Sequence, residues 1–294
     1  MITRKLASIT ALLLVGVCCA LGETAIHQRD TFLKECAPAD IKVATSMDDP
    51  GVDDTTRVVI FKKVAVDGLP AWLLRCPNIE MLRFLGGSTA FSQETAETIS
   101  KLKRLRFLLF DSTVTETPKD WSGLAALENL QVLSLTNAGL SFVPDGIGEM
   151  KNVRSLYLNM NRLTGLPAGL AKLTGLRELS LSDNQITSLS GVMADLNVED
   201  LDLSGNDLSA VSGKQLPRRL KTLSLSRNKM GQFLAGVDSM KFLEELFLND
   251  NYFDEAPAEL LQCQRLKRVH LSRYVRVPKF SGTSKQLEIV KLDP

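Results

Sequence analysis

The residues from Leu176 to Ile186, LRELSLSDNQI, decide how the rest of the chain is interpreted. Leucine stands at the first, fourth and sixth positions of this string, asparagine at the ninth and isoleucine at the eleventh. A helix face repeats about every 3.6 residues, and a half-buried strand alternates along its whole length, so neither periodicity accounts for the string. The spacing instead predicts a short strand that ends at its asparagine.

The string recurs along the chain at a nearly constant interval. Four further copies keep the asparagine, at Asn161, Asn206, Asn228 and Asn251. Weaker copies, with another residue at the ninth position, extend the series in both directions. The strings begin at 56, 79, 105, 130, 153, 176, 198, 220, 243, 266 and 287, so successive starts lie 21–26 residues apart. Such regular spacing over eleven copies is typical of a repeat solenoid.

The second half of each unit repeats as well. Residues 66–79 (VDGLPAWLLRCPNI), 140–153, 163–176 and 253–266 align without a gap. The strings and these segments together resemble the leucine-rich repeat family, in its variant with about 23 residues per unit, over residues 56–292. The resemblance implies an α/β solenoid with a parallel β-sheet on the concave face and short helical or irregular convex segments. It also implies that each asparagine amide binds the backbone of adjacent turns.

The positions of the string divide between a shared core and the surface. The first, fourth and sixth side chains point into a core, and no unit can bury its apolar face alone, so neighbouring units must stack. The third and fifth side chains point to the concave face. We therefore expect a leucine-rich repeat domain over 56–294, preceded by an N-terminal cap at 23–55. Within the cap, residues 25–35 are expected to form a short amphipathic helix.

The N-terminus predicts export. Arg4 and Lys5 precede an apolar run over residues 9–21, and small residues stand at the −3 and −1 positions before Glu23. This is the pattern of a signal peptide, residues 1–22, and the apolar run is short for a bilayer span. An N-terminal membrane anchor is the alternative. We expect a secreted, periplasmic or cell-envelope protein with no integral membrane segment after cleavage.

Three cysteines follow the expected cleavage site, namely Cys36, Cys76 and Cys263. An odd number does not build a dense disulfide framework. Cys76 and Cys263 occupy a position that holds leucine or methionine in other units, so we expect both to be small core residues. Eight units separate them, roughly 40 Å at about 4.8 Å per strand, which is too far for a disulfide. A pairing of Cys36 with Cys76 stays open.

The third and fifth positions divide the concave face into three zones. The N-terminal zone is apolar and either packs under the cap or forms an exposed patch of the kind that marks interaction sites; it comprises Val58, Ile60, Met81, Phe107, Leu109 and Val132. The middle zone is acidic, with Glu178, Asp183, Glu199, Asp200 and Asp202. The tenth unit is basic, with Lys267, Arg268, His270 and Arg273. Each charged zone is either solvated surface or part of an interface.

Two aromatic residues of the concave face, Tyr157 and Phe247, indicate a binding role. An aromatic side chain on this face has no core to fill, and aromatic residues dominate interface energetics. We therefore predict that a protein partner docks on the concave face of a monomeric chain. The predicted contact residues are Tyr157, Phe247, Asp202, Asp200, Glu178 and His270. A net charge of +1 gives no general reason to expect nucleic acid, although the basic tenth unit offers a local site for a polyanion.

The residues needed for catalysis are nearly missing from the sequence. The two histidines, His27 and His270, are not placed to activate Cys263, which is expected in the core. There is no Cys/His cluster with metal-ligand spacing and no glycine-rich phosphate loop. We expect neither enzyme activity nor a metal or cofactor. The predicted function is therefore that of an exported binding protein; the alternative is a regulatory or inhibitory module that acts on an enzyme, cytosolic if export fails.

Overall fold

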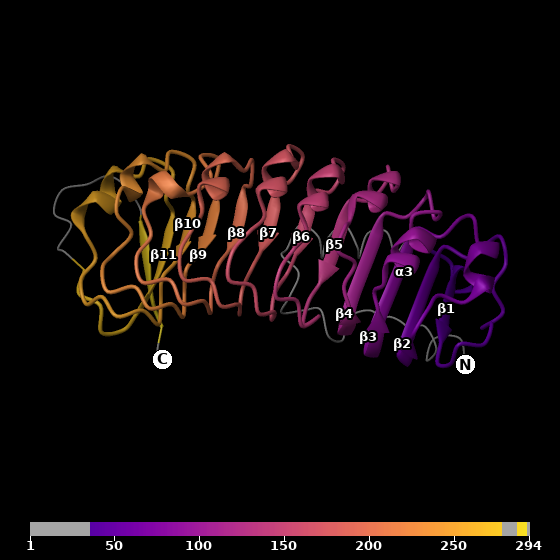
Figure 1. Cartoon of the computed structure of the whole chain (residues 1–294). Coiled ribbons are helices and arrows are strands. Elements are labelled where there is room, and N and C mark those ends of the chain that lie inside the picture. Colours follow the sequence, from indigo (N-terminus) through magenta and orange to yellow (C-terminus); the bar gives the residue numbers. More distant parts are fainter. Residues whose placement is uncertain (1–35, 278–286, 293–294) are drawn as a thin grey trace.

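The computed structural model of the chain describes residues 36–277 and 287–292. Within them twelve strands form one parallel sheet whose order follows the sequence (Figure 1). The strands are β1 (Ile41–Ala44), β2 (Val58–Val66), β3 (Met81–Ala90), β4 (Phe107–Glu116), β5 (Val132–Leu135), β6 (Ser155–Tyr157), β7 (Glu178–Ser180), β8 (Asp200–Asp202), β9 (Thr222–Ser224), β10 (Glu245–Phe247), β11 (Arg268–Ser272) and β12 (Glu288–Leu292). The predicted solenoid is confirmed. The signal peptide and the 25–35 helix lie outside the described residues.

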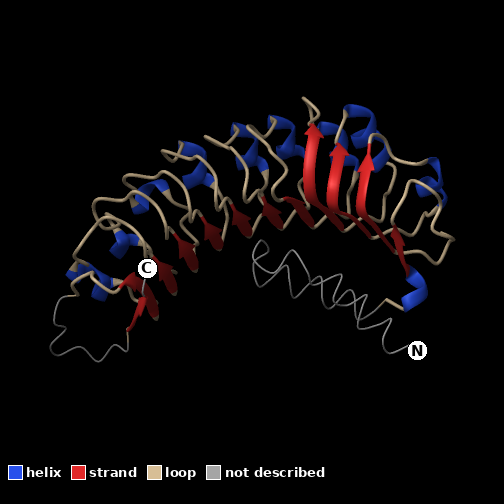
Figure 2. Ribbon diagram, turned by 90° about the horizontal axis from the view of Figure 1, so that it is seen from below, coloured by secondary structure: helices blue, strands red, loops and turns tan. Residues whose placement is uncertain are grey.

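Short helices occupy the outer side of the arc, and the strands line its inner side (Figure 2). Proline takes the N-cap position of four of these helices with φ between −63° and −79°, the range to which its ring confines the backbone. After η1 (Pro38–Asp40), the helices are η2 (Ala71–Arg75), α3 (Gln93–Ile99), η3 (Ser122–Ala126), η4 (Asp145–Glu149), η5 (Ala168–Lys172), η6 (Gly191–Asp195), η7 (Gly213–Gln215), η8 (Val237–Ser239) and η9 (Ala258–Gln262). All but α3 are short 3₁₀ helices of three to five residues.

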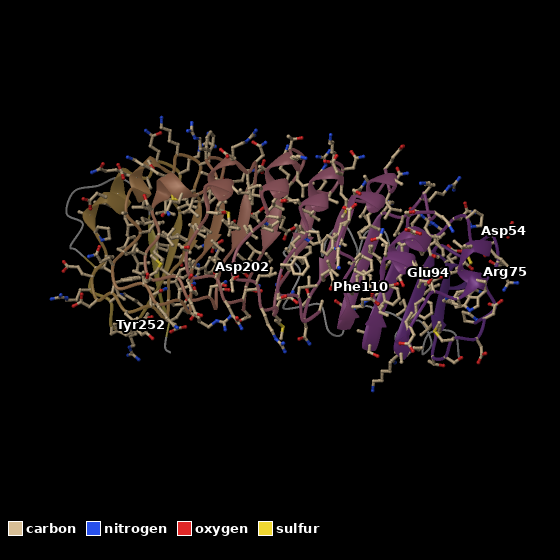
Figure 3. All side chains as sticks on the ribbon, viewed as in Figure 1. Asp54, Arg75, Glu94, Phe110, Asp202 and Tyr252 are labelled. Atoms are coloured by element: carbon tan, nitrogen blue, oxygen red, sulfur yellow. The ribbon has the colours of Figure 1, made fainter. Side chains whose placement is uncertain are left out.

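The apolar core lies between the sheet and the convex segments. The fourth-position leucines are buried in register, so that Leu201 pairs with Leu179 on one side and with Leu223 on the other. The N-terminal units place phenylalanine at the sixth position instead. Phe84 stacks on Phe61 and on Phe110, labelled in Figure 3, with ring centroids 5.3 and 4.7 Å apart. Both arrangements confirm that the fourth and sixth positions point into the core.

The asparagine ladder is present in all five units that have the residue. In Asn206, Nδ2 donates to the carbonyl oxygens of Leu181 and Leu203 at 2.9 and 3.0 Å. Its Oδ1 accepts from the N–H of Ile186 at 3.0 Å. Asn161, Asn184, Asn228 and Asn251 make the same three kinds of bond. A buried amide is stable here because its donor and its acceptor are both satisfied.

Strand length differs between the first repeats and the units that have asparagine. Strands β2, β3 and β4 run for nine or ten residues, whereas β6–β10 have three. Val64 and Gly87 take the asparagine position in the first two, and they pair with each other in a ladder that continues. The residue before this position has a positive φ in both kinds of unit, 55° at Lys63 and 56° at Met160. In the units with asparagine, the side-chain amide donates to backbone carbonyls of its own unit and of the preceding unit, as Asn206 does to Leu203 and Leu181.

Strand β1 lies inside the region expected to be the cap. It pairs in parallel with β2, so that Ile41 and Val43 stand beside Val58 and Ile60. The repeat pattern missed this strand because Lys42 occupies the place where other strands have their fourth-position apolar residue. An end strand has a neighbouring unit on one side only, so this position is not enclosed as it is in the middle of the solenoid.

The cysteine predictions are confirmed for the two core residues. Cys76 and Cys263 are fully buried, and the Sγ of Cys263 donates to the carbonyl oxygen of Val237 at 3.3 Å. Burial raises the pKa of the Cys76 thiol. Within the described residues, no disulfide joins any two of Cys36, Cys76 and Cys263, so the pairing of Cys36 with Cys76 is not formed.

Cys263 should resist thiol reagents until the protein unfolds. A maleimide needs an exposed thiolate, and this sulfur is buried in the convex core, whereas Cys36 is half-buried. Mass spectrometry after timed labelling should find Cys36 modified first, and Cys263 modified only in denaturant. Labelling of Cys263 at the rate of Cys36 in the native protein would show that the convex position is not core.

Candidate functional site

The concave face carries two columns of side chains. Because the strands are in register, the third-position residues Asp200, Thr222 and Glu245 stand side by side on neighbouring strands. So do the fifth-position residues of the same strands. That second column runs through Ser180, Asp202, Ser224, Phe247 and His270, with Asp202 labelled in Figure 3. Neighbours within a column are about 4.8 Å apart.

The two halves of the concave face differ in exposure. Over β2–β6 the apolar side chains of these columns are 0–1% exposed, and we call them the covered concave patch: Val58, Ile60, Met81, Phe107, Leu109, Val132 and Tyr157. Over β8–β11 the same positions are partly or fully exposed, and we call them the open concave surface: Asp200, Asp202, Thr222, Ser224, Glu245, Phe247, Arg268 and His270. The strand register is the same in both halves, so the difference does not come from the sheet.

Two predicted contact residues lie outside the open concave surface. The expectation that the ring of Tyr157 projects into an open groove is wrong, because the residue is buried in the covered concave patch. Glu178 is also buried and accepts a hydrogen bond from the Oγ of Ser155 at 3.2 Å. The repeat pattern decides which face a side chain points to, but not what else lies on that face. Asp200, Asp202, Phe247 and His270 are on the open concave surface.

The apolar N-terminal zone is buried rather than exposed. It packs against Cys36, Ile41 and Val43 from the expected cap, which favours the first of the two interpretations. An ion pair lies on the same face, where Arg83 Nε donates to Asp111 Oδ2 at 2.7 Å. The Arg83 side chain has no exposed surface, which is unusual for a charged group at the surface-facing position of a strand.

An aromatic stack lies on the open concave surface. The rings of Phe247 and His270 are nearly parallel, with centroids 4.1 Å apart. Oε1 of Glu245 lies 2.9 Å from His270 Nε2 and 2.9 Å from Arg268 Nε. One carboxylate therefore orients the imidazole that supports Phe247. The other neighbour of Phe247 in the column is the small Ser224, which leaves space beside the ring.

The acidic zone contains both neutralised and groove-facing carboxylates. Asp183 pairs with Arg227 at 2.9 Å, and Glu199 pairs with Lys221 at 2.6 Å. The hydrogen bond from Lys221 holds the pKa of the Glu199 carboxyl below its ordinary value. Asp202, by contrast, faces the open concave surface.

Hydrogen bonds also fix the Asp202 carboxylate. Its Oδ1 accepts from the backbone N–H and the Oγ of Ser204 at 2.9 and 2.6 Å. Asp202 thus presents an oriented carboxylate on this surface, two residues from Asp200 on the same strand.

The basic zone of the tenth unit is interleaved with acids. Lys267 pairs with Glu244 at 2.5 Å, and Arg268 pairs with Glu245. Arg276 binds Asp254 at 3.1 Å. A polyanion gains affinity from cations that neutralise its own charge, and these cations already face carboxylates of the preceding unit. The ion pairs therefore give no support to the prediction that the basic tenth unit binds a polyanion.

Two exposed tyrosines were not singled out from the sequence. Tyr252 and Tyr274 are 72% and 54% exposed, in the turns that follow β10 and β11 (Figure 3 labels Tyr252). Tyr274 takes the asparagine position of its unit and Tyr252 follows Asn251, so the repeat pattern did not mark either residue as exposed. Their place at the end of the two strands that carry Phe247 and His270 extends the open concave surface towards one rim.

Neither a metal-ligand cluster nor a membrane-length apolar helix is found among the described residues. Among them, no group of three or more His, Cys, Asp or Glu side chains is arranged to hold a metal ion. A search of the same part of the chain found no helix with the length and apolar character of a bilayer span.

Comparison with known proteins supports the fold. The family described as "Leucine rich repeat" matches residues 128–186 and 151–208. No curated protein matches the chain. A leucine-rich repeat protein of Leptospira interrogans is 28% identical, with a TM-score of 0.63 over 74% of this chain and 55% of its own.

Two further solved structures are similar in fold alone. The functional domain of InlJ from Listeria monocytogenes is 17% identical, with a TM-score of 0.58 over 81% of this chain and 49% of its own. TLR13, solved in complex with ssRNA13, is 19% identical, with a TM-score of 0.63 over 75% and 33%. The chain thus spans 33–55% of the length of these three.

The repeat that the family match finds at residues 128–208 continues in parallel register through the whole described sheet. The asparagine ladder extends beyond it to Asn251. The structure accordingly has the leucine-rich repeat solenoid fold, and residues 128–208 match that family.

Proposed function

We propose that this chain is an exported leucine-rich repeat protein that binds a protein partner on its open concave surface, and that its role is binding rather than catalysis. The observation that carries the proposal is the Phe247–His270 stack, held in place by Glu245 on a rigid sheet. A partly exposed aromatic ring with a fixed orientation loses little conformational entropy on binding. Solenoids of this kind use their concave surfaces for recognition.

The charges of the open concave surface suggest the chemistry of the partner. Asp200 and Asp202 favour basic groups at the β8 end, and the Phe247 ring favours an apolar or aromatic group beside Ser224. From Asp202 to His270 the column spans about 14 Å at about 4.8 Å per strand. An ordinary interface takes about 800 Å² from each partner, so we expect contact to extend onto the rim with Tyr252 and Tyr274. Although TLR13 was solved with ssRNA13, the paired cations here favour protein.

Truncation of Phe247 should weaken partner binding without weakening the fold. Phe247→Ala removes the ring that a partner would contact, and a central aromatic anchor contributes about 2 kcal/mol or more, roughly 30-fold in Kd. The matched control is Phe142→Ala, because Phe142 is an exposed phenylalanine away from the concave strands. Both variants should melt close to the parent.

The partner would be isolated with the tagged parent chain from its native host and then titrated against the three purified proteins. Equal affinity of the parent and Phe247→Ala would remove the open concave surface as the docking site. Loss of affinity in Phe142→Ala alone would move the site to the convex side.

Export is tested separately. The proposal is supported by the signal-peptide pattern before Glu23. Protein purified from the native host should begin at Glu23 by N-terminal sequencing and should fractionate outside the cytosol. Recovery of the uncleaved chain from the cytosol would contradict export and favour the cytosolic regulatory module.

A further inference from the structure

One edge of the solenoid concentrates positive charge. The strands of the repeats begin along a single edge of the arc, the upper edge in Figure 1. We define the basic edge as the two residues before each string and the second residue of the string, in the eight units that start at 105 to 266. Its cations are Lys103, Arg104, Arg106, Lys151, Arg154, Arg177, Arg218, Arg219, Lys221, Lys241, Arg265 and Lys267.

The charge of the basic edge is set against the rest of the chain. Three acidic residues share its positions with the twelve cations, namely Glu128, Glu199 and Glu244, so its formal charge is 12 − 3 = +9. The whole chain has a net charge of +1, which leaves −8 for all other residues. A near-neutral chain therefore has one strongly basic side, and an asymmetry of this kind gives a local field that attracts anions.

Backbone hydrogen bonds show that the basic edge is one continuous row. The N–H of Arg154 donates to the carbonyl oxygen of Gln131, and the N–H of Arg177 donates to that of Arg154, both at 2.8 Å. The same bond joins the second residues of successive strings from Glu80 to Lys267. From β4 to β11 the row is about 34 Å long at about 4.8 Å per strand. Its cations can therefore act together on one extended partner.

Most of these cations are not neutralised by carboxylates of the chain. Four of the twelve pair with a glutamate: Arg106, Arg177, Lys221 and Lys267. The other eight are exposed, and in the described part of the chain no ion pair joins them to a carboxylate: Lys103, Arg104, Lys151, Arg154, Arg218, Arg219, Lys241 and Arg265. The basic edge differs in this respect from the cations of the tenth unit, which face acids.

An exposed apolar side chain lies among the cations. Phe242 directly precedes its string and is 41% exposed. The guanidinium of Arg265 lies over its ring, 5.0 Å from the centroid. Binding to a lipid surface combines electrostatic attraction to anionic headgroups with burial of apolar side chains at the boundary of the acyl chains. Phe242 and the cations beside it supply both contributions.

The basic edge suits a lipid surface better than a nucleic acid. Proteins that bind single strands stack successive bases on aromatic side chains, and proteins that read duplexes place a helix or a β-ribbon in a groove. Phe242 is the only aromatic residue at the positions of the basic edge, so no series of stacking rings accompanies the cations. Strands in parallel register begin on one side of the arc, so the row faces one direction along its length (Figure 1).

We propose that the basic edge binds the surface of an anionic lipid bilayer, with its cations at the headgroups and Phe242 at their boundary with the acyl chains. The solenoid then stands on the edge where its strands begin. The open concave surface stays at the side of the arc, where a protein partner can reach it. The two surfaces are separate, so this proposal does not rest on the proposed function.

Vesicle sedimentation tests the proposal with the chain that begins at Glu23. The protein should sediment with vesicles of phosphatidylcholine and phosphatidylglycerol mixed one to one, and it should stay in solution with phosphatidylcholine alone. A cation near an anionic surface contributes about fivefold to binding. About 1 M salt shortens the Debye length to about 3 Å, so it should release the protein.

Charge reversal locates the contact. Arg218→Glu combined with Arg219→Glu removes two cations of the basic edge, so it should weaken vesicle binding by more than about 25-fold. The matched control is Lys63→Glu combined with Arg162→Glu, which changes the net charge equally at two exposed residues, the eighth and tenth of their strings. The control should bind like the parent, and both double variants should melt like it.

A single substitution in another unit repeats the test where the first double variant melts lower than the parent. Lys151→Glu lies three units away on the basic edge and should weaken vesicle binding by about fivefold or more. Normal vesicle binding by Lys151→Glu and by the variant at 218 and 219 would overturn the proposal.

Three other results would also overturn it. Equal weakening by the two double variants would mean that net charge, not the basic edge, governs binding. Equal sedimentation with both kinds of vesicle would mean that anionic headgroups are not recognised. Binding to soluble polyphosphate without binding to vesicles would assign the edge to a linear polyanion. None of these results depends on the partner of the open concave surface, so the two proposals fail independently.

Discussion

Leu201→Asp should unfold the central units of the solenoid at room temperature. Leu201 is buried between Leu179 and Leu223, so the new carboxylate has leucine on both sides and no cation within the core. Loss of the leucine contacts alone costs about 2–5 kcal/mol, and burial of an unpaired charge adds several more. The total is comparable to the whole stability of an ordinary domain, about 5–15 kcal/mol. Urea titration monitored by circular dichroism measures the loss.

Two controls separate the charge from the cavity. Leu201→Ala keeps the cavity without the charge, and Ser224→Asp places the same carboxyl on the open concave surface, where it should cost little. Burial raises the pKa of the carboxyl introduced by Leu201→Asp above its unfolded value. Its penalty is therefore complete above the folded pKa and shrinks as pH falls towards the unfolded pKa. The gap between Leu201→Asp and Leu201→Ala should narrow on acidification. Melting of Leu201→Asp like the parent would refute the assignment of the fourth position to the core.

Asn206→Leu should destabilise the solenoid although it makes the core more apolar. The amide of Asn206 satisfies the carbonyls of Leu181 and Leu203 and the N–H of Ile186. Leucine leaves these three groups without that partner. Each buried polar group left unsatisfied costs about 1–3 kcal/mol, so we expect a loss of roughly 3–5 kcal/mol in the free energy of unfolding. Because the bonds reach two units, hydrogen exchange should speed up in both.

An exposed asparagine provides the comparison. Asn129 Nδ2 makes a single bond, to the carbonyl oxygen of Lys103 at 2.9 Å. Asn129→Ala should cost no more than about 1 kcal/mol, because water replaces the lost bond. Equal stability of Asn206→Leu and the parent would show that the ladder does not hold neighbouring turns together.

The N-terminal repeats show how a pattern can predict a fold and still miss its details. The string that starts at Thr56 was correctly assigned to a strand, but the length of that strand was not predicted. Val64 takes the asparagine position and pairs with Gly87, and β2 continues to Val66. β1 was missed because Lys42 breaks the apolar pattern at a site that the end of a solenoid tolerates. The repeat pattern is therefore less predictive at the end of the solenoid, where a strand has a neighbouring unit on one side only.

The sequence by itself determined the solenoid, the inward direction of the first, fourth and sixth positions of the string, and the burial of Cys76 and Cys263. It could do so because a strand of fixed register has one inward face, and stacking repeats that face identically along the chain. It also placed Phe247 and Asp202 on the concave side.

Only the tertiary structure decided that Tyr157 is buried, that His270 stacks on Phe247, and that the cations of the tenth unit face carboxylates. These outcomes depend on contacts between side chains about 23 residues apart, or on what covers a face. A repeat pattern carries no information about either, because it specifies the face to which a residue points and leaves open what it meets there.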